Sequence, residues 1–105
     1  MRQKNKRGIL SMCRKAGKMV MGMDMVKDSI NNGEAKSVFY ADDISPKSLK
    51  EVKFFCGKSG VRLFSLEMTM EELGLCIGKK VGVVSVTDAG FAKSISKGLE
   101  QTECE

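Results

Sequence analysis

The segment Val81-Gly82-Val83-Val84-Ser85-Val86 is the clearest strand signal in the chain. It is a short run rich in β-branched residues, which favour extended backbone. The run is apolar at consecutive positions instead of alternating with polar residues, and this pattern is typical of a strand that is buried on both faces. Both faces of such a strand must be covered by other elements. The segment therefore predicts a layered α/β domain with helices on both sides of a sheet.

Helical and strand patterns alternate on either side of this segment. We expect helices over 5–16, Asp24 to Gly33, Ser45 to Gly57 or Gly60, Thr69 to Gly78, and Asp88 to Leu99, and strands over 18–21, 37–41, 61–66 and 81–86. The spacing of apolar residues predicts that the first two helices bury Ile9, Met12, Cys13 and Ala16, and Met25, Val26, Ser29 and Ile30. The tail 101–105 is expected to fray. The pattern predicts one domain over 1–105, a three-layer α-β-α sandwich with a small mixed, mainly parallel sheet of about four strands.

Positive charge is concentrated at the start of the chain. Residues 1–23 contain seven basic and no acidic side chains, and because the net charge of the whole chain is +5, the remainder carries −2. Such a segment indicates a polyanionic partner, although a solvated charged surface remains the alternative. We expect Arg14, Lys15 and Lys18 to form an ordered basic face beside the turn at Gly22. The remaining cations, Arg2, Lys4, Lys6 and Arg7, are expected to form a loose electrostatic arm.

The composition argues against a metal centre, a disulfide framework and an enzyme. The cysteines Cys13, Cys56, Cys76 and Cys104 are scattered without a C-x-x-C pair, and the chain has no His. We therefore interpret them as small apolar fillers, with no metal and no cofactor. A cysteine nucleophile also lacks a histidine base here. No apolar run approaches the ~20 residues of a membrane span, and no secretory signal is evident, so we expect a cytoplasmic protein, without a membrane partner and monomeric.

Four segments, in order along the chain, resemble one protein family. They are Ala16–Asp24 (AGKMVMGMD), Ala41–Ser45 (ADDIS), Thr69–Gly78 (TMEELGLCIG) and Val86–Ala92 (VTDAGFA). The first is similar to the A-G-K-x-x-x-G-x-D segment of bacterial YlxQ proteins, the second to A-E-D-x-S, and the third to T-K-E-E-L-G-x-x-x-G. The chain thus resembles a bacterial YlxQ-type member of the kink-turn RNA-binding ribosomal protein superfamily, the L-seven-Ae and L-thirty-e group. The resemblance runs from about residue 8 to residue 95.

This resemblance implies an α-β-α sandwich that binds sharply bent internal-loop RNA, without catalysis or a cofactor. It places RNA on the helix start at Gly22, where a glycine allows close approach and free N–H groups attract phosphate. Leu66 and Met68 stand where relatives pack apolar side chains against an extruded base, although two core residues flanking a loop are an equal interpretation. The predicted RNA-binding residues are Arg14, Lys15, Lys18, Gly22, Met23, Asp24, Met25, Lys27, Asp28, Leu66, Glu67, Met68, Thr69 and Met70.

Several of these positions depart from the family pattern. Met25 stands where Glu or Gln reads guanine in well-known binders, and Asp28 and Met70 stand where Lys is common. A Met side chain cannot hydrogen-bond a guanine edge, and an Asp repels phosphate. Lys27 is rotated by ~100° from Asp28 on a helix, so it compensates only in part. The sequence therefore predicts a ribosome-associated RNA-binding protein with weakened kink-turn specificity.

A protein-interaction adaptor is the alternative function. Methionines surround the predicted site, and Met adapts its shape to varied surfaces. They are Met19, Met21, Met23, Met25, Met68 and Met70. An adaptor of this kind is expected to dock on ribosomal or RNA-processing proteins and to have lost most RNA specificity. The two hypotheses differ in their partner: structured RNA, ribosomal or other non-coding, for the first, and protein for the second.

Overall fold

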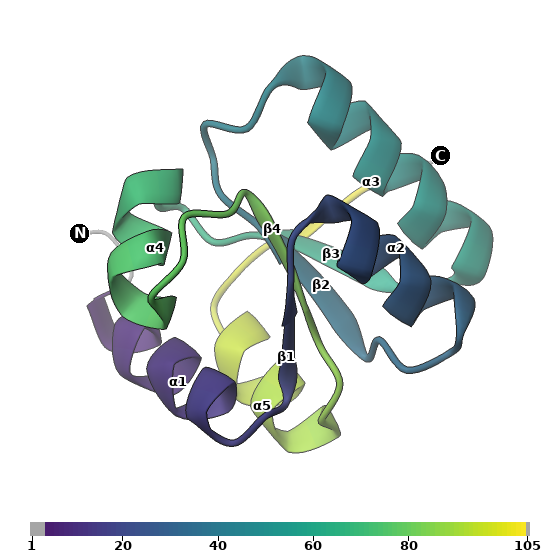
Figure 1. Cartoon of the computed structure of the whole chain (residues 1–105). Helices are drawn as coiled ribbons and strands as arrows, with labels where there is room; N and C mark the ends of the chain where they lie inside the picture. The colour runs from purple at the N-terminus through teal and green to yellow at the C-terminus, as the bar shows by residue number, and fades with distance from the viewer. Residues whose placement is uncertain (1–3, 105) are drawn as a thin grey trace.

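A computed structural model describes residues 4–104 of the chain (Figure 1). Its elements are α1 (Lys4–Lys15), β1 (Met19–Met21), α2 (Met23–Asn31), β2 (Ser37–Tyr40), α3 (Pro46–Ser59), β3 (Arg62–Ser65), α4 (Met70–Ile77), β4 (Val83–Val86), α5 (Ala89–Ser96) and β5 (Gln101–Thr102). The alternation of helices and strands confirms the predicted α/β class. None of the helices in this described part of the chain has both the length and the apolar character needed to cross a bilayer.

The strands form one mixed sheet in the order β1-β4-β2-β3-β5. Within the described residues, β2 and β3 pair in parallel, whereas β1–β4, β2–β4 and β3–β5 pair antiparallel. The expectation of a mainly parallel sheet is therefore wrong, whereas the mixed sheet and the four expected strands are confirmed, and the two-residue β5 is added to them. Sequence periodicity gives the strands but not their order. β4 lies between β1 and β2 and runs against both, so these two strands do not pair although they run in the same direction.

Helices cover both faces of the sheet, which confirms the sandwich. In Figure 1, α1, α4 and α5 lie on one side, and α2 and α3 on the other. Phe39 and Val84 belong to the core under α1, α4 and α5, whereas Val38 and Val83, each one position earlier, belong to the core under α2 and α3. Alternate residues of a strand point to opposite faces, so a strand with two covered faces is mostly apolar. The buried exception in β4, Ser85, exchanges a hydrogen bond with the Ser29 hydroxyl of α2 at 2.7 Å.

The capping residues explain where three of the helices begin. Ser45 accepts a hydrogen bond from the Ser48 N–H at the start of α3, and Asp88 accepts one from the Phe91 N–H at the start of α5. At α4, the Glu72 N–H donates to Thr69 Oγ1 (3.1 Å) and the Thr69 N–H donates to Glu72 Oε1 (2.8 Å). The predicted capping box is confirmed.

The cap expected at Asp24 is wrong, as is the burial expected for Met25. Gly22 is the cap position of α2, and Asp24 lies in the first turn of that helix. Val26 and Ile30 are buried as predicted, but the side chain of Met25 is 58% exposed. The buried stripe of α2 consists of Val26, Ser29 and Ile30, and Met25, one residue before Val26, lies outside it on the solvent side.

The N-terminal helix is held by its cations, so the loose arm expected there is wrong. Lys6 is buried, and its ammonium donates to the carbonyl oxygens of Ser94 (3.1 Å) and Lys97, at the C-terminus of α5. Burial, and secondarily the charge of Lys97, lowers the pKa of Lys6. Arg7 pairs with Glu72 of α4 at 3.3 Å. Lys4 begins α1, and Arg2 lies outside the described residues.

The same helix turns a different face to the core than predicted. Leu10 and Cys13 are fully buried, but Met12 is 60% exposed. Cys13 and Cys56 act as the apolar fillers that the sequence predicted, and all four thiols are free. Burial raises the pKa of Cys13 to about 11 and that of Cys56 to about 12.

The acidic tail is ordered up to residue 104, contrary to the expected fraying. Gln101 and Thr102 pair with Phe64 and Leu63 at the outer edge of β3, and the Thr102 hydroxyl contacts the Tyr40 hydroxyl at 3.0 Å. The edge of a sheet offers unpaired N–H and C=O groups, which the tail satisfies. Glu105 lies outside the described residues.

Candidate nucleic-acid interface

Three helix N-termini meet at one end of the sheet. β1, β2 and β3 run in the same direction, and each leads through a short loop into α2, α3 or α4. We call this end, formed by residues 22–28, 41–48, 66–72 and 82–83, the loop end; it is uppermost in Figure 1. The first turn of each helix carries N–H groups without helical partners and a partial positive charge. Side chains of the described residues already accept the Ser48 N–H of α3 and the Met70 and Glu72 N–H groups of α4, whereas no side chain caps α2. The start of α2 therefore supplies most of the backbone donors that the loop end presents.

Gly22 makes the turn from β1 into α2. Its φ of 97° and ψ of 148° lie in a region that is essentially restricted to glycine. The Gly22 N–H donates to the carbonyl oxygen of Val83 (3.0 Å), and the Gly22 carbonyl oxygen accepts from the Val26 N–H (2.9 Å). Only a residue without a Cβ continues both the sheet and the helix at this point without strain.

The first turns of α2 present acids and methionine to solvent. Asp24, Met25 and Asp28 are exposed, whereas Met23 is half-buried. Lys27 forms an ion pair with Glu51 of α3, and its ammonium lies 5.2 Å from the centroid of the Phe55 ring. The charge of Lys27 is thus already used within the protein, which reduces its capacity to replace a lysine at position 28.

The second predicted loop, residues 66–70, is anchored in the core. Leu66 and Met68 are buried, which supports their interpretation as core residues that flank a loop. Between them, Glu67 is exposed and adopts a positive φ of 59°. Met70 begins α4, and its N–H donates to Asp43 Oδ1 (2.8 Å), which ties the loop after β2 to the loop after β3.

A hollow of about 240 Å³ lies among these loops. It is lined by Met23, Ile44, Ser45, Ser48, Met70, Gly82 and Val83. The sequence did not assign Ile44, Ser45, Ser48, Gly82 or Val83 to the site. A Cβ added to Gly82 would lie 2.6 Å from Ile44 Cγ2 and 3.2 Å from Met70 Sδ. The absence of a side chain at Gly82 therefore allows the side chains of Ile44 and Met70 to pack against its backbone. A glycine inside a strand pattern often marks such a close approach, so Gly82 within the segment 81–86 was the sequence signal that could have indicated this contact.

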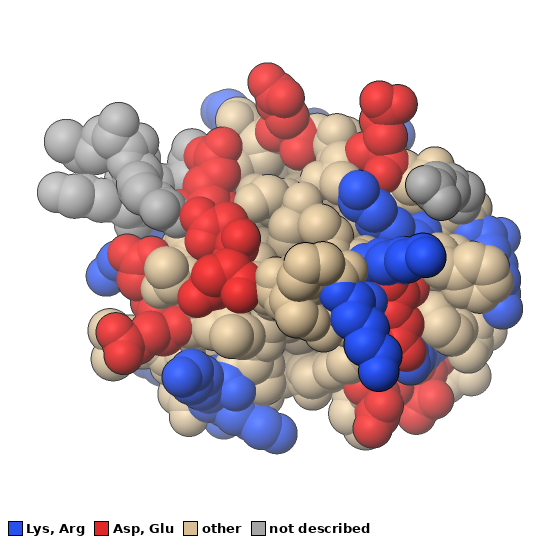
Figure 2. Space-filling model, turned by 90° about the horizontal axis from the view of Figure 1, so that it is seen from above, with Lys and Arg blue, Asp and Glu red and all other residues tan. Residues whose placement is uncertain are grey.

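Charge is unevenly distributed over the loop end. Figure 2 views it from above: acidic side chains gather on the side of α4, a mostly uncharged surface lies in the middle, and basic side chains gather toward α3. The exposed acids of these loops include Asp42, Asp43, Glu67 and Glu71. These carboxylates oppose the approach of a phosphate backbone on one side and leave the uncharged centre and the α3 side as the accessible part.

The predicted basic residues do not gather around Gly22. The Thr87 N–H donates to the carbonyl oxygen of Lys18, and the Gly22 N–H donates to that of Val83, so Lys18 and Gly22 lie at opposite ends of β1. Four extended residues separate their Cα atoms by about 13 Å. Arg14 and Lys15 end α1 on the Lys18 side. The expectation that these three cations surround Gly22 is wrong, because it treated neighbours in sequence as neighbours in space across a strand.

A family model matches the chain over residues 5–96, and it describes the Ribosomal protein L7Ae/L30e/S12e/Gadd45 family. The chain belongs to this family. The resemblance proposed from the sequence is thereby confirmed, and the match covers all five helices except the start of α1. The sandwich and the mixed sheet agree with the family's fold.

Within this family, the chain is similar to YlxQ and eL30 proteins. The chain is 36% identical over 93 residues to the RNA-binding protein YlxQ of Bacillus subtilis, covering 88% of this chain and 92% of that protein. It is 33% identical over 92 residues to YlxQ of Enterococcus faecium, covering 88% of each. The large ribosomal subunit protein eL30 of Aeropyrum pernix is 28% identical over 91 residues, with 85% and 87% covered.

A solved structure shows the same fold. A protein of unknown function from Bacillus halodurans matches with a TM-score of 0.85 and 23% identity, covering 90% of this chain and 96% of that one. The curated relatives are described as RNA-binding or ribosomal proteins, not as enzymes. This agrees with the prediction that the chain is not an enzyme.

Proposed function

We propose that this chain binds structured, kink-turn-like RNA through the loop end. The observation that carries the proposal is the convergence of α2, α3 and α4 N-termini around one hollow, on the surface where the family resemblance places RNA. Backbone N–H groups at helix starts bind phosphate and base edges. The names of the YlxQ and eL30 relatives support RNA as the class of partner.

We further propose that kink-turn specificity is weaker here than in relatives with Glu and Lys at the corresponding positions. Met25 is exposed on the first turn of α2, where it offers no strong hydrogen-bonding group to a guanine. Asp28 is exposed on the same helix and repels phosphate, and Lys27 is paired with Glu51. RNA recognition then depends more on backbone contacts and on RNA shape than on base reading.

A binding titration tests the proposed function. The full chain is titrated against a kink-turn RNA and against a plain RNA duplex of equal length, at two salt concentrations. We expect both to bind, with a modest preference for the kink-turn, and weaker binding of both at higher salt because counterions are released on association. Failure to bind the kink-turn RNA at low salt overturns the proposal.

The double variant Met25→Glu plus Asp28→Lys tests the placement of the site. It restores a guanine acceptor and a backbone cation at the surface of α2, so kink-turn affinity should rise about tenfold. The plain duplex is the matched control, since any general charge effect changes its affinity by the same factor. A variant whose preference for the kink-turn over the duplex stays at the wild-type ratio shows that the site lies elsewhere.

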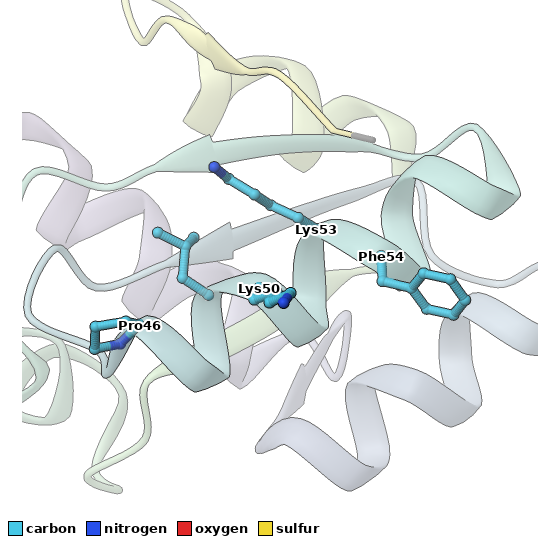
Figure 3. A pocket seen from close by; sticks show the side chains of 5 residues that line it. Pro46, Lys50, Lys53 and Phe54 are labelled. Carbon is cyan, nitrogen blue, oxygen red and sulfur yellow. The ribbon is translucent and has the colours of Figure 1, made fainter.

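A protein-interaction adaptor remains the second candidate, and an exposed apolar surface on α3 favours it. A hollow of about 280 Å³ is lined by Pro46, Leu49, Lys50, Lys53 and Phe54 (Figure 3). Phe54 is 57% exposed, and the Lys58 ammonium lies 5.6 Å from its ring centroid. Exposed aromatic side chains of this kind are enriched at the centres of protein interfaces.

The two functions predict different results when the protein is purified from cells with its partners. A protein adaptor keeps ribosomal or RNA-processing proteins after nuclease treatment, and Phe54→Asp releases them. An RNA-binding protein loses these partners on nuclease treatment, whatever residue stands at position 54.

A further inference from the structure

The end of the sheet opposite the loop end carries a row of cations. Lys18 precedes β1, Lys36 precedes β2, and Arg62 begins β3. Backbone hydrogen bonds of the sheet align these residues. The Thr87 N–H, just after β4, donates to the Lys18 carbonyl, and the Lys36 N–H donates to the Val86 carbonyl. Arg62 is paired with Ser37, the residue that follows Lys36. The pairing of the strands therefore fixes the positions of these three residues at one end of the sheet.

A hollow at this end collects three of the cations. It has a volume of about 420 Å³, and its lining residues are Lys36, Ser37, Gly60, Arg62, Ala89, Ala92, Lys93 and Ser96. Lys93 comes from α5, which lies at the lower end of the molecule in Figure 1. The lining contains small and polar side chains beside the three cations and no large apolar one. Such a lining suits a polar, negatively charged group more than the apolar anchor of a protein partner.

A second hollow adjoins the first and extends the surface toward β1. It has a volume of about 470 Å³ and is lined by Gly17, Val20, Glu34, Lys36 and Thr87. Lys36 lines both hollows, so the two hollows adjoin at this side chain. We call this surface, with Lys18, Lys36, Arg62 and Lys93, the basic end; Arg14 and Lys15 at the C-terminus of α1 lie on the same side of the sheet.

The cations of the basic end are available to a ligand. Lys18, Lys36, Arg62 and Lys93 are all exposed. Two ion pairs among the side chains that the structure describes join Arg7 to Glu72 and Lys27 to Glu51, and neither involves a cation of this end. The nearby acids are Glu34, which lines the second hollow, Asp88, whose carboxylate accepts the Phe91 N–H at 2.9 Å, and Glu103, which follows the Thr102–Leu63 pair and so lies opposite Arg62. These three acids are outnumbered by the cations Arg14, Lys15, Lys18, Lys36, Arg62 and Lys93. Positive charge thus predominates here.

The spacing of this row fits a phosphate backbone. Adjacent strands are about 4.8 Å apart, so the two strand steps from Lys18 to Lys36 and the one step from Lys36 to Arg62 span about 15 Å. Several consecutive phosphates of one strand lie along such a length. The backbone of an RNA helix has this regular, sequence-independent charge, and basic side chains bind it by releasing its counterions.

We propose that the basic end is a second RNA-binding surface, which holds the phosphate backbone of an RNA helix without reading its sequence. It lies across the sheet from the loop end, in a molecule whose extents are 30 × 26 × 24 Å. One domain then binds two RNA segments on opposite sides, a structured loop at one end and a helix at the other. The proposal goes beyond the proposed function and shares with it only the class of partner.

Charge removal at the basic end tests this surface. The triple variant Lys36→Gln, Arg62→Gln and Lys93→Gln is compared with a control that loses equal charge elsewhere, at the exposed residues Arg7, Lys79 and Lys80. The probe is a plain RNA duplex, titrated at several salt concentrations. We expect the triple variant to lose at least tenfold in affinity and the slope of log K against log salt to fall by about 2 to 3 units, since about one counterion is released per phosphate contact. The control should change by less than about a third of that slope.

Further measurements separate this proposal from misfolding and from failure of the loop end. A charge-conserving variant, Lys36→Arg, Arg62→Lys and Lys93→Arg, should keep duplex affinity, and a fluorescently labelled duplex should still bind when the loop end is saturated with kink-turn RNA. Duplex affinity equal in the basic-end and control variants overturns the proposal, even if the kink-turn RNA binds normally. Loss of kink-turn binding with retained duplex binding overturns the proposed function of the loop end alone. Binding of an acidic peptide but not of the duplex through these cations overturns the RNA assignment.

Discussion

The replacement of glycine by alanine should have opposite effects at two positions of this chain. Gly22 has a φ of 97° at the entrance to α2, whereas Gly8 lies inside α1, and an added Cβ meets no atom within 4 Å at either position. Packing is therefore the same in both cases, and the two substitutions differ in backbone conformation alone. This makes the pair a direct measure of the strain that Gly22 avoids.

The expected magnitudes follow from the two backbone conformations. An alanine forced into the region that Gly22 occupies costs about 1–3 kcal/mol of stability. An alanine in place of an exposed helical glycine such as Gly8 stabilises by about 1 kcal/mol, because it restricts the unfolded chain and favours the helix. For a domain of this size, 1 kcal/mol shifts the melting temperature by roughly 4–8 °C. Gly8→Ala should thus raise the melting temperature by about that amount, and Gly22→Ala should lower it by roughly 4–24 °C.

Urea unfolding followed by circular dichroism measures both free energies, and thermal unfolding gives an independent check. The slope of the unfolding free energy against urea should be equal for the two variants, since neither changes the surface exposed on unfolding. If Gly22→Ala is as stable as the wild type, or if both variants shift in the same direction, then the turn at residue 22 does not have the geometry described, and the start of α2 must be reconsidered.

Three further outcomes follow from the structure. The free energy of unfolding should fall above pH 9 by about 1 kcal/mol per pH unit for each of Cys13 and Cys56. The reason is that these thiols have a pKa of about 11 and about 12 in the folded state but ionise near 9.0 in the unfolded state. Urea unfolding at pH 8 and pH 10.5, in reducing buffer, should show this pH dependence in the wild type and its loss in the double alanine variant. Thr69→Ala should cost about 1 kcal/mol through loss of the capping box, and a cost near zero in thermal unfolding contradicts the cap. Deletion of residues 101–105 should speed amide hydrogen exchange in β3 at Leu63, whose N–H faces β5 because the N–H groups of Phe64 and Leu66 face β2; unchanged exchange at Leu63 contradicts the pairing.

The local signals in the sequence predicted the elements well but not their arrangement. Caps such as Ser45 and Thr69 act within four residues, so their hydrogen bonds follow from sequence spacing alone. The position of β4 between β1 and β2 depends on contacts between residues that are far apart in sequence, including the packing of the helices on the two faces of the sheet. The burial of Lys6 was missed because its partners are carbonyl groups of α5, almost the whole chain away.

The site was predicted in part for the same reason. Gly22 and Met25 were placed at a helix start because the motif is continuous in sequence, and the structure puts them there. Gly82 was not assigned to the site because its neighbours Ile44 and Met70 come from other loops. The cations before β1 were assigned to the wrong end, since a strand of three residues carries the chain across the whole sheet.

The bond that Lys6 makes to α5 has a practical consequence for chemical labelling. An acylating reagent at mildly alkaline pH reacts with accessible neutral amines, and the lowered pKa of Lys6 would by itself make that amine more reactive. Its position under α5, with 6% of the residue exposed, shields it from such reagents. Limited acetylation should therefore neutralise the exposed lysines while the hydrogen bonds from Lys6 of α1 to the end of α5 stay intact.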